Sequence, residues 1–470
     1  MKRTRILQST LGSLVAIVLG MSSTIAAGAQ TAPKISELFV FPCNVNGCPN
    51  GGNPTGALIQ ASDGDFYGTT FNTNPLGFRQ GGTIFRVTAA GQLTTLFTFV
   101  ADQNGKFSAG SSPAAGLAEG RDGFLYGTTE FGGASNSGVL FRIEKNGSGF
   151  QVLHNFCSAP SCGDGGNPAA PLFQGTDGNL YGTTGAGGAS AAGVIFRISP
   201  SDSFTTLHNF NSSTEGTLPS GLIQATDGNF YGNVRRFGPL CGATYRLTPA
   251  GQFTVLKHFP QPSECFPVGE LVQASSGLLY GDTFYGEEFQ ISLSGAYQAL
   301  GIDIPGGGLK TGPTGLTQAS DGNLWGSQLS GSSGSVFALS TVGSLVVEAN
   351  FDCQASKLLQ GADGKFYGAG GACGDNFAGN IFAVDAGLPT PRPSIGTFTP
   401  ASGKAGSQVT LSGDHFIGTT TVSFNGASAT FKVLNTNYIT ATVPLGATSG
   451  PIAVTNAGGS AKSASTFRVQ

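Results

Sequence analysis

The chain has 470 residues, of which only 10% are charged, and its formal net charge is −3 at pH 7. This composition supplies no basic stripe that would neutralise a phosphate backbone, so we expect no nucleic-acid partner. Glycine stands out with 75 residues, but it has no three-residue period and alternates with apolar residues, which excludes collagen and argues against disorder.

The first thirty residues are arranged like a secretory signal. Basic residues near the N-terminus precede an apolar run over 11–21 that is too short to form a stable membrane span. The small residues Ala27 and Ala29 then predict cleavage after position 29, so that 1–29 is the signal peptide. We expect a secreted or cell-surface protein, exported by the Sec pathway to the periplasm or beyond, with no integral membrane segment after the signal is removed.

One phrase recurs seven times and defines a repeat. It contains Asp-Gly, then a variable residue, an aromatic residue or Leu, an aromatic residue and Gly, as in SDGDFYGTT (62–70) and TDGNLYGTT (176–184). The aromatic residues that anchor it are Tyr67, Tyr126, Tyr181, Tyr231, Tyr280, Trp325 and Tyr367.

Each phrase lies among three further strand-like pieces. An apolar piece such as GALIQAS precedes it, and pieces such as GTIFRVT and LTTLFTF follow it. Four short strands in a unit of about 40 to 60 residues are typical of a β-propeller blade. The sequence therefore predicts an all-β fold with a seven-bladed β-propeller over residues 30–388.

The two ends of the repeat array complement each other. The last repeat stops after its third strand at 379–385, whereas residues 34–42 form an additional strand of the fourth type. Pairing of the two would close the ring and remove two exposed sheet edges. An open solenoid is the alternative.

The Asp-Gly pairs indicate tight hairpins. We expect two-residue turns of the inverted type, with positive φ at both central residues, so the aspartates are first of all turn formers. A ring of six of them is the one Ca²⁺ candidate: Asp63, Asp122, Asp177, Asp227, Asp321 and Asp363. The fifth repeat has Ser276 in this place, which argues against a common ligand, so we expect no cofactor and keep Ca²⁺ as the alternative.

Eight cysteines in an exported chain indicate disulfides. Cys43 with Cys48, and Cys157 with Cys162, lie close together after strands of the fourth type, so each pair is predicted to bridge its own loop. Laying out the blades places the other four in neighbouring loops on one face, so we predict that Cys241 bonds to Cys265 and Cys353 to Cys373. Free or differently paired thiols are the alternative.

That cysteine-bearing face also carries the long and variable loops. Because binding residues concentrate on loops held by a rigid scaffold, a site is expected there or at the mouth of the central channel. The candidate binding residues are Phe78, Phe131 and Phe237.

A search for catalytic chemistry finds no motif in a supporting context, so no catalytic, cofactor-binding or metal-binding residue is predicted. His154, His208 and His258 recur at equivalent repeat positions and are expected to be structural, while His415 stands alone. Paired carboxylates for glycoside hydrolysis remain open. Their unranked candidates are Glu130, Asp164, Glu215, Glu264, Glu287, Glu288 and Asp375.

The repeat resembles the GloVer tandem-repeat family of exported bacterial proteins in its DGxFYGTT phrase, its double glycine, its GTIFR strand and its TLFTF ending. The resemblance covers roughly residues 34–385, and repeats four to six depart from it, as in YGNVRRFGPLCGATYRL (231–247) and YGDTFYGEEFQISL (280–293). It implies a place outside the cytoplasm more than a chemistry.

Composition changes after the stiff segment PTPRP (389–393), which reads as a linker. Residues 394–470 resemble an IPT/TIG domain, with Pro400, Gly406, the turn from Gly413 to Phe416 and Phe424-Asn425-Gly426. This resemblance implies an immunoglobulin-like β-sandwich, a class that the alternating short strands also favour.

We therefore expect a monomeric, non-catalytic binding or scaffold protein that recognises a glycan or an extracellular protein through the long-loop face. A structural cell-surface repeat protein and a polysaccharide-active lyase or hydrolase are the alternatives.

Overall fold

The computed structural model describes residues 33–43, 47–72, 81–237, 241–260, 265–301, 315–330, 333–351, 354–371 and 378–470. All of them belong to one compact unit. No helix within these ranges is both long and apolar enough to cross a membrane.

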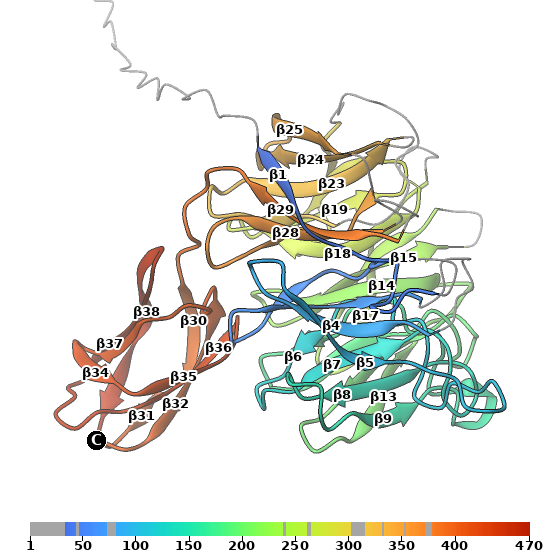
Figure 1. The fold of residues 1–470 in the computed structure, drawn as a ribbon. Helices are drawn as coiled ribbons and strands as arrows, with labels where there is room; N and C mark the ends of the chain where they lie inside the picture. The colour runs from blue at the N-terminus through green and yellow to red at the C-terminus, as the bar shows by residue number, and fades with distance from the viewer. Residues whose placement is uncertain are drawn as a thin grey trace, which may run out of the picture. The chain divides into compact units, whose positions relative to one another are not determined.

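Seven antiparallel sheets are formed by the described residues up to Asp385 (Figure 1). The first three consist of β2 (Ile59–Gln60), β3 (Phe66–Thr70), β4 (Thr83–Val87) and β5 (Leu93–Thr98); β6 (Ala118–Glu119), β7 (Leu125–Thr129), β8 (Val139–Ile143) and β9 (Gln151–Asn155); and β10 (Phe173–Gln174), β11 (Leu180–Thr183), β12 (Val194–Ile198) and β13 (Phe204–Asn209). A short 3₁₀ turn, η1 (Pro160–Cys162), follows β9.

The fourth to sixth sheets repeat this order. They consist of β14 (Thr217–Gln224), β15 (Phe230–Arg236), β16 (Ala243–Leu247) and β17 (Phe253–His258); β18 (Pro267–Gln273), β19 (Leu279–Thr283), β20 (Glu288–Ile291) and β21 (Tyr297–Ala299); and β22 (Thr317–Gln318), β23 (Leu324–Ser330), β24 (Ser333–Leu339) and β25 (Leu345–Phe351). In every sheet the predicted phrase supplies the second strand, because its alternating apolar and small residues suit a strand buried on both faces.

The seventh sheet joins the two ends of the array. It contains β26 (Gln354–Ala355), β27 (Leu359–Gln360), β28 (Phe366–Gly371) and β29 (Asn380–Asp385), with β1 (Lys34–Val40) as its outer strand. β1 pairs antiparallel with β29, from Lys34 opposite Asp385 to Val40 opposite Asn380. The predicted closure by the N-terminal strand is confirmed.

Hydrogen bonds link each of these sheets to the next. At most junctions a glutamine that ends an inner strand accepts from a backbone N–H of the neighbouring turn, as Gln224 does from Thr176 at 2.9 Å. The same bond, from Ala362 N–H to Gln60 at 2.9 Å, joins the seventh sheet to the first. The seven sheets therefore form a closed β-propeller rather than an open solenoid.

The Asp-Gly turns differ from the predicted type. Gly64 has φ +89°, but Asp63 does not adopt positive φ, and the paired residues Ala61 and Asp65 enclose three residues rather than two. The two-residue inverted turn was therefore wrong, because a three-residue hairpin needs the left-handed conformation at one position only.

The aspartate recurs for another reason. Its carboxylate accepts a hydrogen bond from the phrase's own aromatic residue, as Asp63 does from the Tyr67 hydroxyl at 2.8 Å and Asp177 from Tyr181 at 2.7 Å. Burial, and then the bond to Asp177, raise the pKa of Tyr181 to about 12, so the phenol stays protonated and donates. In the fifth sheet, where Ser276 replaces the aspartate, Tyr280 donates instead to the Thr341 carbonyl at 3.0 Å.

A buried phenylalanine packs successive sheets against each other in the core. It follows five of the outer strands and meets, edge to face or tilted, an aromatic ring of the next sheet's third strand, with ring centroids 5.2 to 5.7 Å apart. The pairs are Phe41 with Phe85, Phe99 with Phe141, Phe156 with Phe196, Phe210 with Tyr245, and Phe259 with Phe289. All five phenylalanines are at most 1% exposed, so the core lies mainly between sheets.

The C-terminal residues form a two-sheet sandwich. One sheet contains β30 (Ser394–Thr399), β32 (Gln408–Asp414), β36 (Tyr438–Thr442) and β35 (Phe431–Asn435); the other contains β31 (Ser402–Gly403), β38 (Gly459–Val469), β37 (Gly450–Asn456), β33 (Thr421–Phe424) and β34 (Ala427–Ala429). Leu411, Phe424, Ile439 and Phe467 are buried together between them. The predicted immunoglobulin-like class is confirmed.

The sandwich contacts the Asp-Gly ends of the second and third sheets. The Tyr438 hydroxyl donates to the Gly175 carbonyl at 3.1 Å, and Asn435 donates to the Glu119 carbonyl at 2.8 Å. The Arg121 guanidinium lies over the Tyr438 ring at 3.5 Å. These contacts leave the opposite ends of the sheets to the long loops.

Candidate binding face

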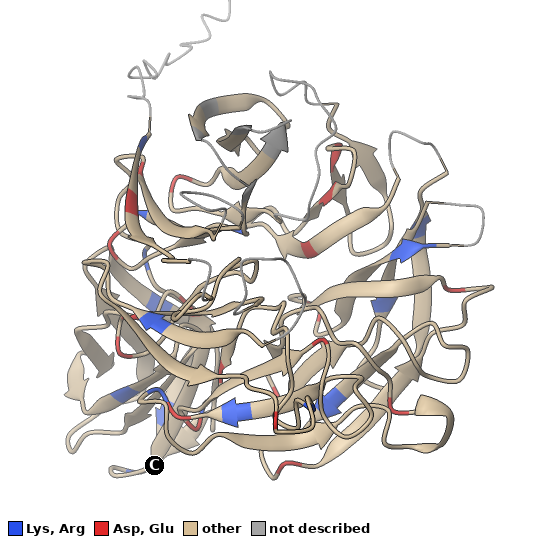
Figure 2. Ribbon diagram, turned by 45° about the vertical axis from the view of Figure 1, so that its right-hand side comes forward, with Lys and Arg blue, Asp and Glu red and all other residues tan. Residues whose placement is uncertain are grey.

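The loops between second and third strands and the segments that enter each inner strand lie at the same ends of the sheets. Two hydrogen bonds join them in each of the first three sheets, as between Ser111 and Phe131. We call these ends, opposite the Asp-Gly turns, the loop face. Lys, Arg, Asp and Glu are sparse and of both signs over the described part of the ribbon (Figure 2).

Disulfides reinforce the loop face. Cys43 is bonded to Cys48, Cys157 to Cys162 and Cys241 to Cys265, which are the pairings predicted for these six residues. Cys353 and Cys373 lie outside the described residues. The segments around the inner strands are thus covalently held at three places.

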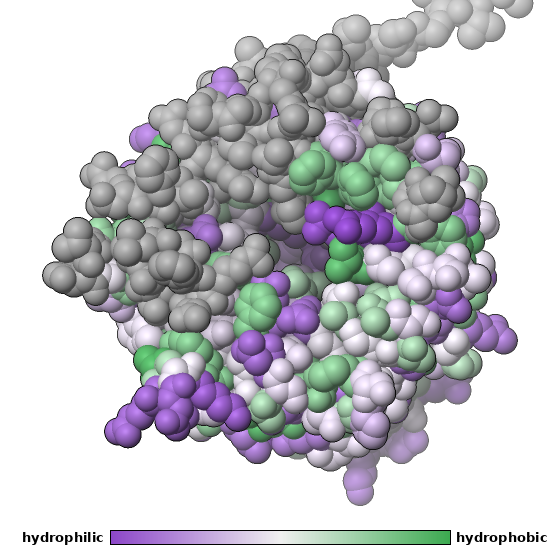
Figure 3. All heavy atoms as spheres, turned by 90° about the vertical axis from the view of Figure 1, so that its right-hand side faces the viewer, coloured by the Kyte–Doolittle hydropathy of each residue, from purple (hydrophilic) through white to green (hydrophobic). Residues whose placement is uncertain are grey.

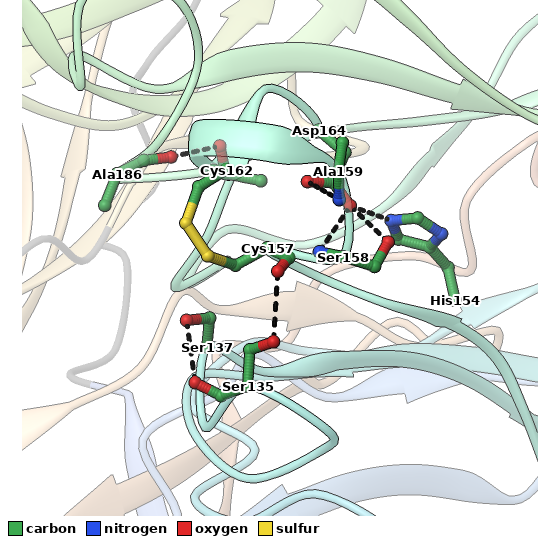
Figure 4. Close-up of a disulfide and its surroundings, with 10 residues drawn as sticks. Ser135, Ser137, His154, Cys157, Ser158, Ala159, Cys162, Asp164 and Ala186 are labelled. Carbon is green, nitrogen blue, oxygen red and sulfur yellow. Dashed lines mark hydrogen bonds and ion pairs between the residues drawn. A yellow bond between two sulfur atoms is a disulfide. The ribbon is translucent and has the colours of Figure 1, made fainter.

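A buried carboxylate organises the Cys157–Cys162 loop (Figure 4). Asp164 accepts hydrogen bonds from the Ser158 hydroxyl at 2.7 Å, from the Ala159 N–H at 3.1 Å and from His154 Nε2 at 3.0 Å. Burial opposes its charge, but these hydrogen bonds outweigh it and lower the pKa of Asp164. Burial also lowers the pKa of His154 despite the neighbouring carboxylate, so the pair holds a neutral imidazole and a charged carboxylate at neutral pH.

The histidines occupy a packing position of the repeat. His154 stacks on Phe204 with centroids 3.7 Å apart, and His208 stacks on Phe253 at 4.5 Å. Phe97 fills the same place in the first sheet, stacked on Phe150 at 3.9 Å. Since a phenylalanine serves equally well there, stacking explains these imidazoles without catalysis.

Two of the three predicted phenylalanines lie partly exposed on this face. Phe131 lines a groove together with Phe107, Asn104, Lys106 and Asn136. Phe237 packs on His258, with ring centroids 4.4 Å apart. Phe78 lies outside the described residues.

A third aromatic group was not predicted. Phe266, Phe284 and Tyr285 lie together, with centroid separations of 5.5 to 6.4 Å, and Tyr285 is 40% exposed. Phe266 directly follows the disulfide-bonded Cys265, and its N–H donates to the Cys241 carbonyl at 2.6 Å. We call these three residues the aromatic cluster.

Phe266 occupies a left-handed position of the repeat. The equivalent residues before a proline are Asn53, Ser112, Asn167 and Leu218, and all five have φ between 53° and 59°. Asn adopts this conformation readily, whereas a bulky Phe or Leu does so at a cost. Backbone strain of this kind concentrates at functional sites. Leu218 in the fourth sheet and Phe266 in the fifth therefore mark this part of the face as a candidate site.

A cavity of about 240 Å³ opens at the centre of the ring. Segments from all seven sheets line it, mainly with small residues such as Gly56, Ala115 and Ala170, and Leu218 and Val268 add apolar surface. Figure 3 shows a hollow on this side, bordered by strongly hydrophilic and apolar side chains where grey atoms do not cover it.

Three ionisable residues from the described part of the chain line this cavity: Arg235, Glu270 and Lys357. Lys357 Nζ lies 2.9 Å from the Glu270 carboxylate, which joins the seventh sheet to the fifth. No carboxylate pairs with Arg235 in the described part of the chain. Burial, and then the charge of Arg236, lower the pKa of Arg235.

The described residues hold no group of three or more His, Cys, Asp or Glu placed to bind a metal ion. Of the described residues that line the cavity, Glu270 supplies the one carboxylate, which Lys357 holds, and none is a histidine or a cysteine. The arrangement is suited to binding through cationic, apolar and backbone groups.

The family model of the Gloeobacter/Verrucomicrobia repeat matches residues 32–174 and 106–293, which together cover more than half of the chain. The chain belongs to this repeat family. The IPT/TIG domain family matches residues 393–469 of the same repeat protein. No curated protein sequence matches it significantly.

Solved propellers share the fold of this Gloeobacter/Verrucomicrobia repeat protein. A streptogramin B lyase is 13% identical, with a TM-score of 0.53 over 76% of this chain and 99% of its own. A catalytically inactive virginiamycin B lyase from Staphylococcus aureus, solved with quinupristin, is 17% identical, with a TM-score of 0.53 over 75% and 99%. The extracellular domain of a hybrid two-component system from B. thetaiotaomicron is 11% identical, with a TM-score of 0.50 over 93% and 57%. At these identities the likeness concerns the fold alone.

Of the predicted phenylalanines of this repeat protein, Phe131 and Phe237 do not meet in one place, because they come from the second and the fourth sheet. The aromatic cluster and Arg235 lie where the fourth and fifth repeats depart from the family phrase, in YGNVRR (231–236) and YGDTFYG (280–286). That departure was the available signal, since residues required by turns and core are the ones that recur.

Proposed function

We propose that this protein is an extracellular, non-catalytic glycan-binding protein whose ligand contacts the loop face around Phe266, Phe284 and Tyr285. The observation that carries the proposal is the aromatic cluster itself. Tyr285 is 40% exposed and rests on two further rings, and the chain before Phe266 is tied down by the Cys241–Cys265 disulfide.

A rigid aromatic platform suits a sugar ring. An aromatic side chain offers large apolar area with few rotatable bonds, and a tyrosine adds a polar hydroxyl at its tip. The covalently anchored backbone lowers the conformational entropy lost on binding. The few charges on this face also fit a ligand that is bound mainly by stacking and hydrogen bonds.

Phe131 and Phe107 extend the same character to the second sheet. Their groove adds the exposed polar groups of Asn104, Lys106 and Asn136 beside the rings. A glycan chain that spans several sheets would find aromatic and hydrogen-bonding groups at intervals along the loop face.

The test is a glycan array probed with the full-length exported protein, with Tyr285→Ala and Leu445→Ala as a matched pair. Leu445 is 93% exposed on the sandwich, so its loss controls for the removal of an exposed apolar side chain. We expect Tyr285→Ala to weaken binding at least about tenfold, as loss of a central aromatic contact does, and Leu445→Ala to leave binding unchanged.

Equal binding by Tyr285→Ala and wild type would move the site away from the aromatic cluster. An array without glycan hits, combined with specific capture of one extracellular protein, would replace the glycan by a protein ligand. Cleaved sugar among the products would favour the lyase or hydrolase alternative.

A further inference from the structure

Strand β18 joins the aromatic cluster to the wall of the cavity at the ring centre. β18 begins at Pro267, directly after Phe266, and its residues Val268, Gly269 and Glu270 form part of the cavity wall. A chain-like ligand that stacks on the cluster can therefore place a neighbouring unit at the cavity. The volume of about 240 Å³ limits that unit to a small group.

Two glycines allow the charged side chains to reach across this cavity. A Cβ on Gly221 would lie 3.0 Å from a Glu270 carboxylate oxygen and closer still to its methylene carbon, and one on Gly315 would lie 3.2 Å from the Lys357 chain. Both side chains thus lie on bare backbone, and their ion pair at 2.9 Å neutralises them both. Among the described lining residues this leaves one positive charge without a counter-ion, that of Arg235.

Arg235 has the properties of a residue that binds a ligand. It follows Val234 near the end of β15, its side chain is about half-buried, and no hydrogen bond or ion pair of this side chain is found in the described residues. A guanidinium removed from water without a partner is unfavourable, because its donors lose hydrogen bonds to solvent. An anion delivered by a ligand would supply them.

The chemistry of the missing partner follows from the shape of the guanidinium. Its planar fork donates two parallel hydrogen bonds, which match the two oxygens of a carboxylate. The small, mostly uncharged wall formed by Gly56, Ala115 and Ala170 leaves room for a ring beside that contact.

We infer that the cavity binds the carboxylate of a uronic-acid unit of the glycan, with Arg235 as the residue that recognises it. This inference rests on the proposed glycan binding and adds the class of sugar. Lys357 and Glu270 act as positioning residues that keep the described part of the wall neutral apart from Arg235.

The experiment uses the full-length protein with glucuronate- and galacturonate-terminated oligosaccharides and their carboxyl-reduced forms. We expect wild type to bind the acidic form at least about tenfold more tightly than the reduced form, since a charge-assisted bidentate pair contributes this much. Arg235→Gln should abolish the preference while retaining the affinity for the reduced form. Arg236→Gln, a change at the exposed neighbour, should keep the preference.

The outcomes separate the two proposals. Tight binding of neutral glycans that depends on Tyr285 but shows no preference for the acidic forms would overturn the uronate inference and leave the proposed function standing. A preference that survives Arg235→Gln would also overturn it. Absence of any glycan binding would remove both proposals. If inorganic phosphate bound as tightly as the acidic oligosaccharides, the cavity would be an unselective anion site and the carboxylate assignment would be overturned.

Discussion

Phe41→Ala is expected to destabilise the whole propeller by about 3–5 kcal/mol, the usual effect of deleting a fully buried phenylalanine side chain. Phe41 is 1% exposed and follows β1, the outer strand of the seventh sheet, while its ring meets Phe85 of the first sheet at 5.5 Å. At the point of closure it therefore makes the same ring contact between neighbouring sheets that Phe210 makes with Tyr245 between the third and fourth sheets.

The single tryptophan makes this prediction easy to measure. Trp325 is fully buried in the sixth sheet and stacks on Phe366 of the seventh at 4.5 Å, one junction away from the Phe41–Phe85 contact, so its fluorescence during denaturation reports on unfolding beyond the substituted junction. In a closed ring, Phe41→Ala and the control Phe210→Ala should both lower the tryptophan midpoint. An open array responds locally, so an unchanged Trp325 transition in Phe41→Ala would contradict closure.

Gly127→Ala is expected to destabilise the protein by about 1–3 kcal/mol, the range for an added methyl group in a packed core. A Cβ at this position would lie 2.6 Å from Phe141 Cζ and 2.8 Å from Leu117 Cδ2. Phe141 cannot retreat, because Phe99 and Phe150 pack against it at 5.7 and 5.4 Å. The Gly of the repeated Tyr-Gly pair is thus a packing requirement.

The control is Gly123→Ala in the turn of the same sheet. Gly123 has φ +89°, and a Cβ at this position would have no neighbour within 4 Å, so its substitution costs only backbone strain, about 1–2 kcal/mol. Thermal or chemical denaturation should show that Gly127→Ala, unlike Gly123→Ala, is coupled to Phe141. In a Phe141→Leu background the loss in free energy of unfolding caused by Gly127→Ala should shrink, while the loss caused by Gly123→Ala stays the same. Equal effects in both backgrounds would refute the steric account.

The architecture could be predicted because the same local requirements recur in every repeat. Tyr67 and its counterparts, the small residue after each of them and the phenylalanine after five of the outer strands all serve the contacts within and between sheets. The additional strand at 34–40 then predicted closure, since β29 would otherwise present an unpaired edge.

The turn chemistry was predicted less well. Asp63 was interpreted from hairpin statistics, whereas the structure assigns its recurrence to the hydrogen bond from Tyr67, four residues along the chain. A rule that considers only the turn residues cannot predict a hydrogen bond between a turn side chain and a side chain of the strand that follows.

The candidate site could be predicted only as a face. The loop positions of Phe131 and Phe237 follow from the blade layout, but contact between Phe266 and Phe284 depends on two separate loops, and the cavity combines short Gly- and Ala-rich segments of seven sheets. None of these segments carries a motif by itself. Arg235 becomes distinctive only when its surroundings show that it has no carboxylate partner among the described residues.

The central claim, that ligand binds the loop face of the fourth and fifth sheets, is tested most directly by hydrogen exchange of the full-length protein with and without the tightest-binding glycan of the array. The account predicts slower exchange at 217–221, 266–270 and 283–287, and unchanged exchange at the Asp-Gly turns 120–124 and 225–229 on the opposite ends of the sheets. Protection confined to those turns or to the sandwich at 394–470 would contradict it.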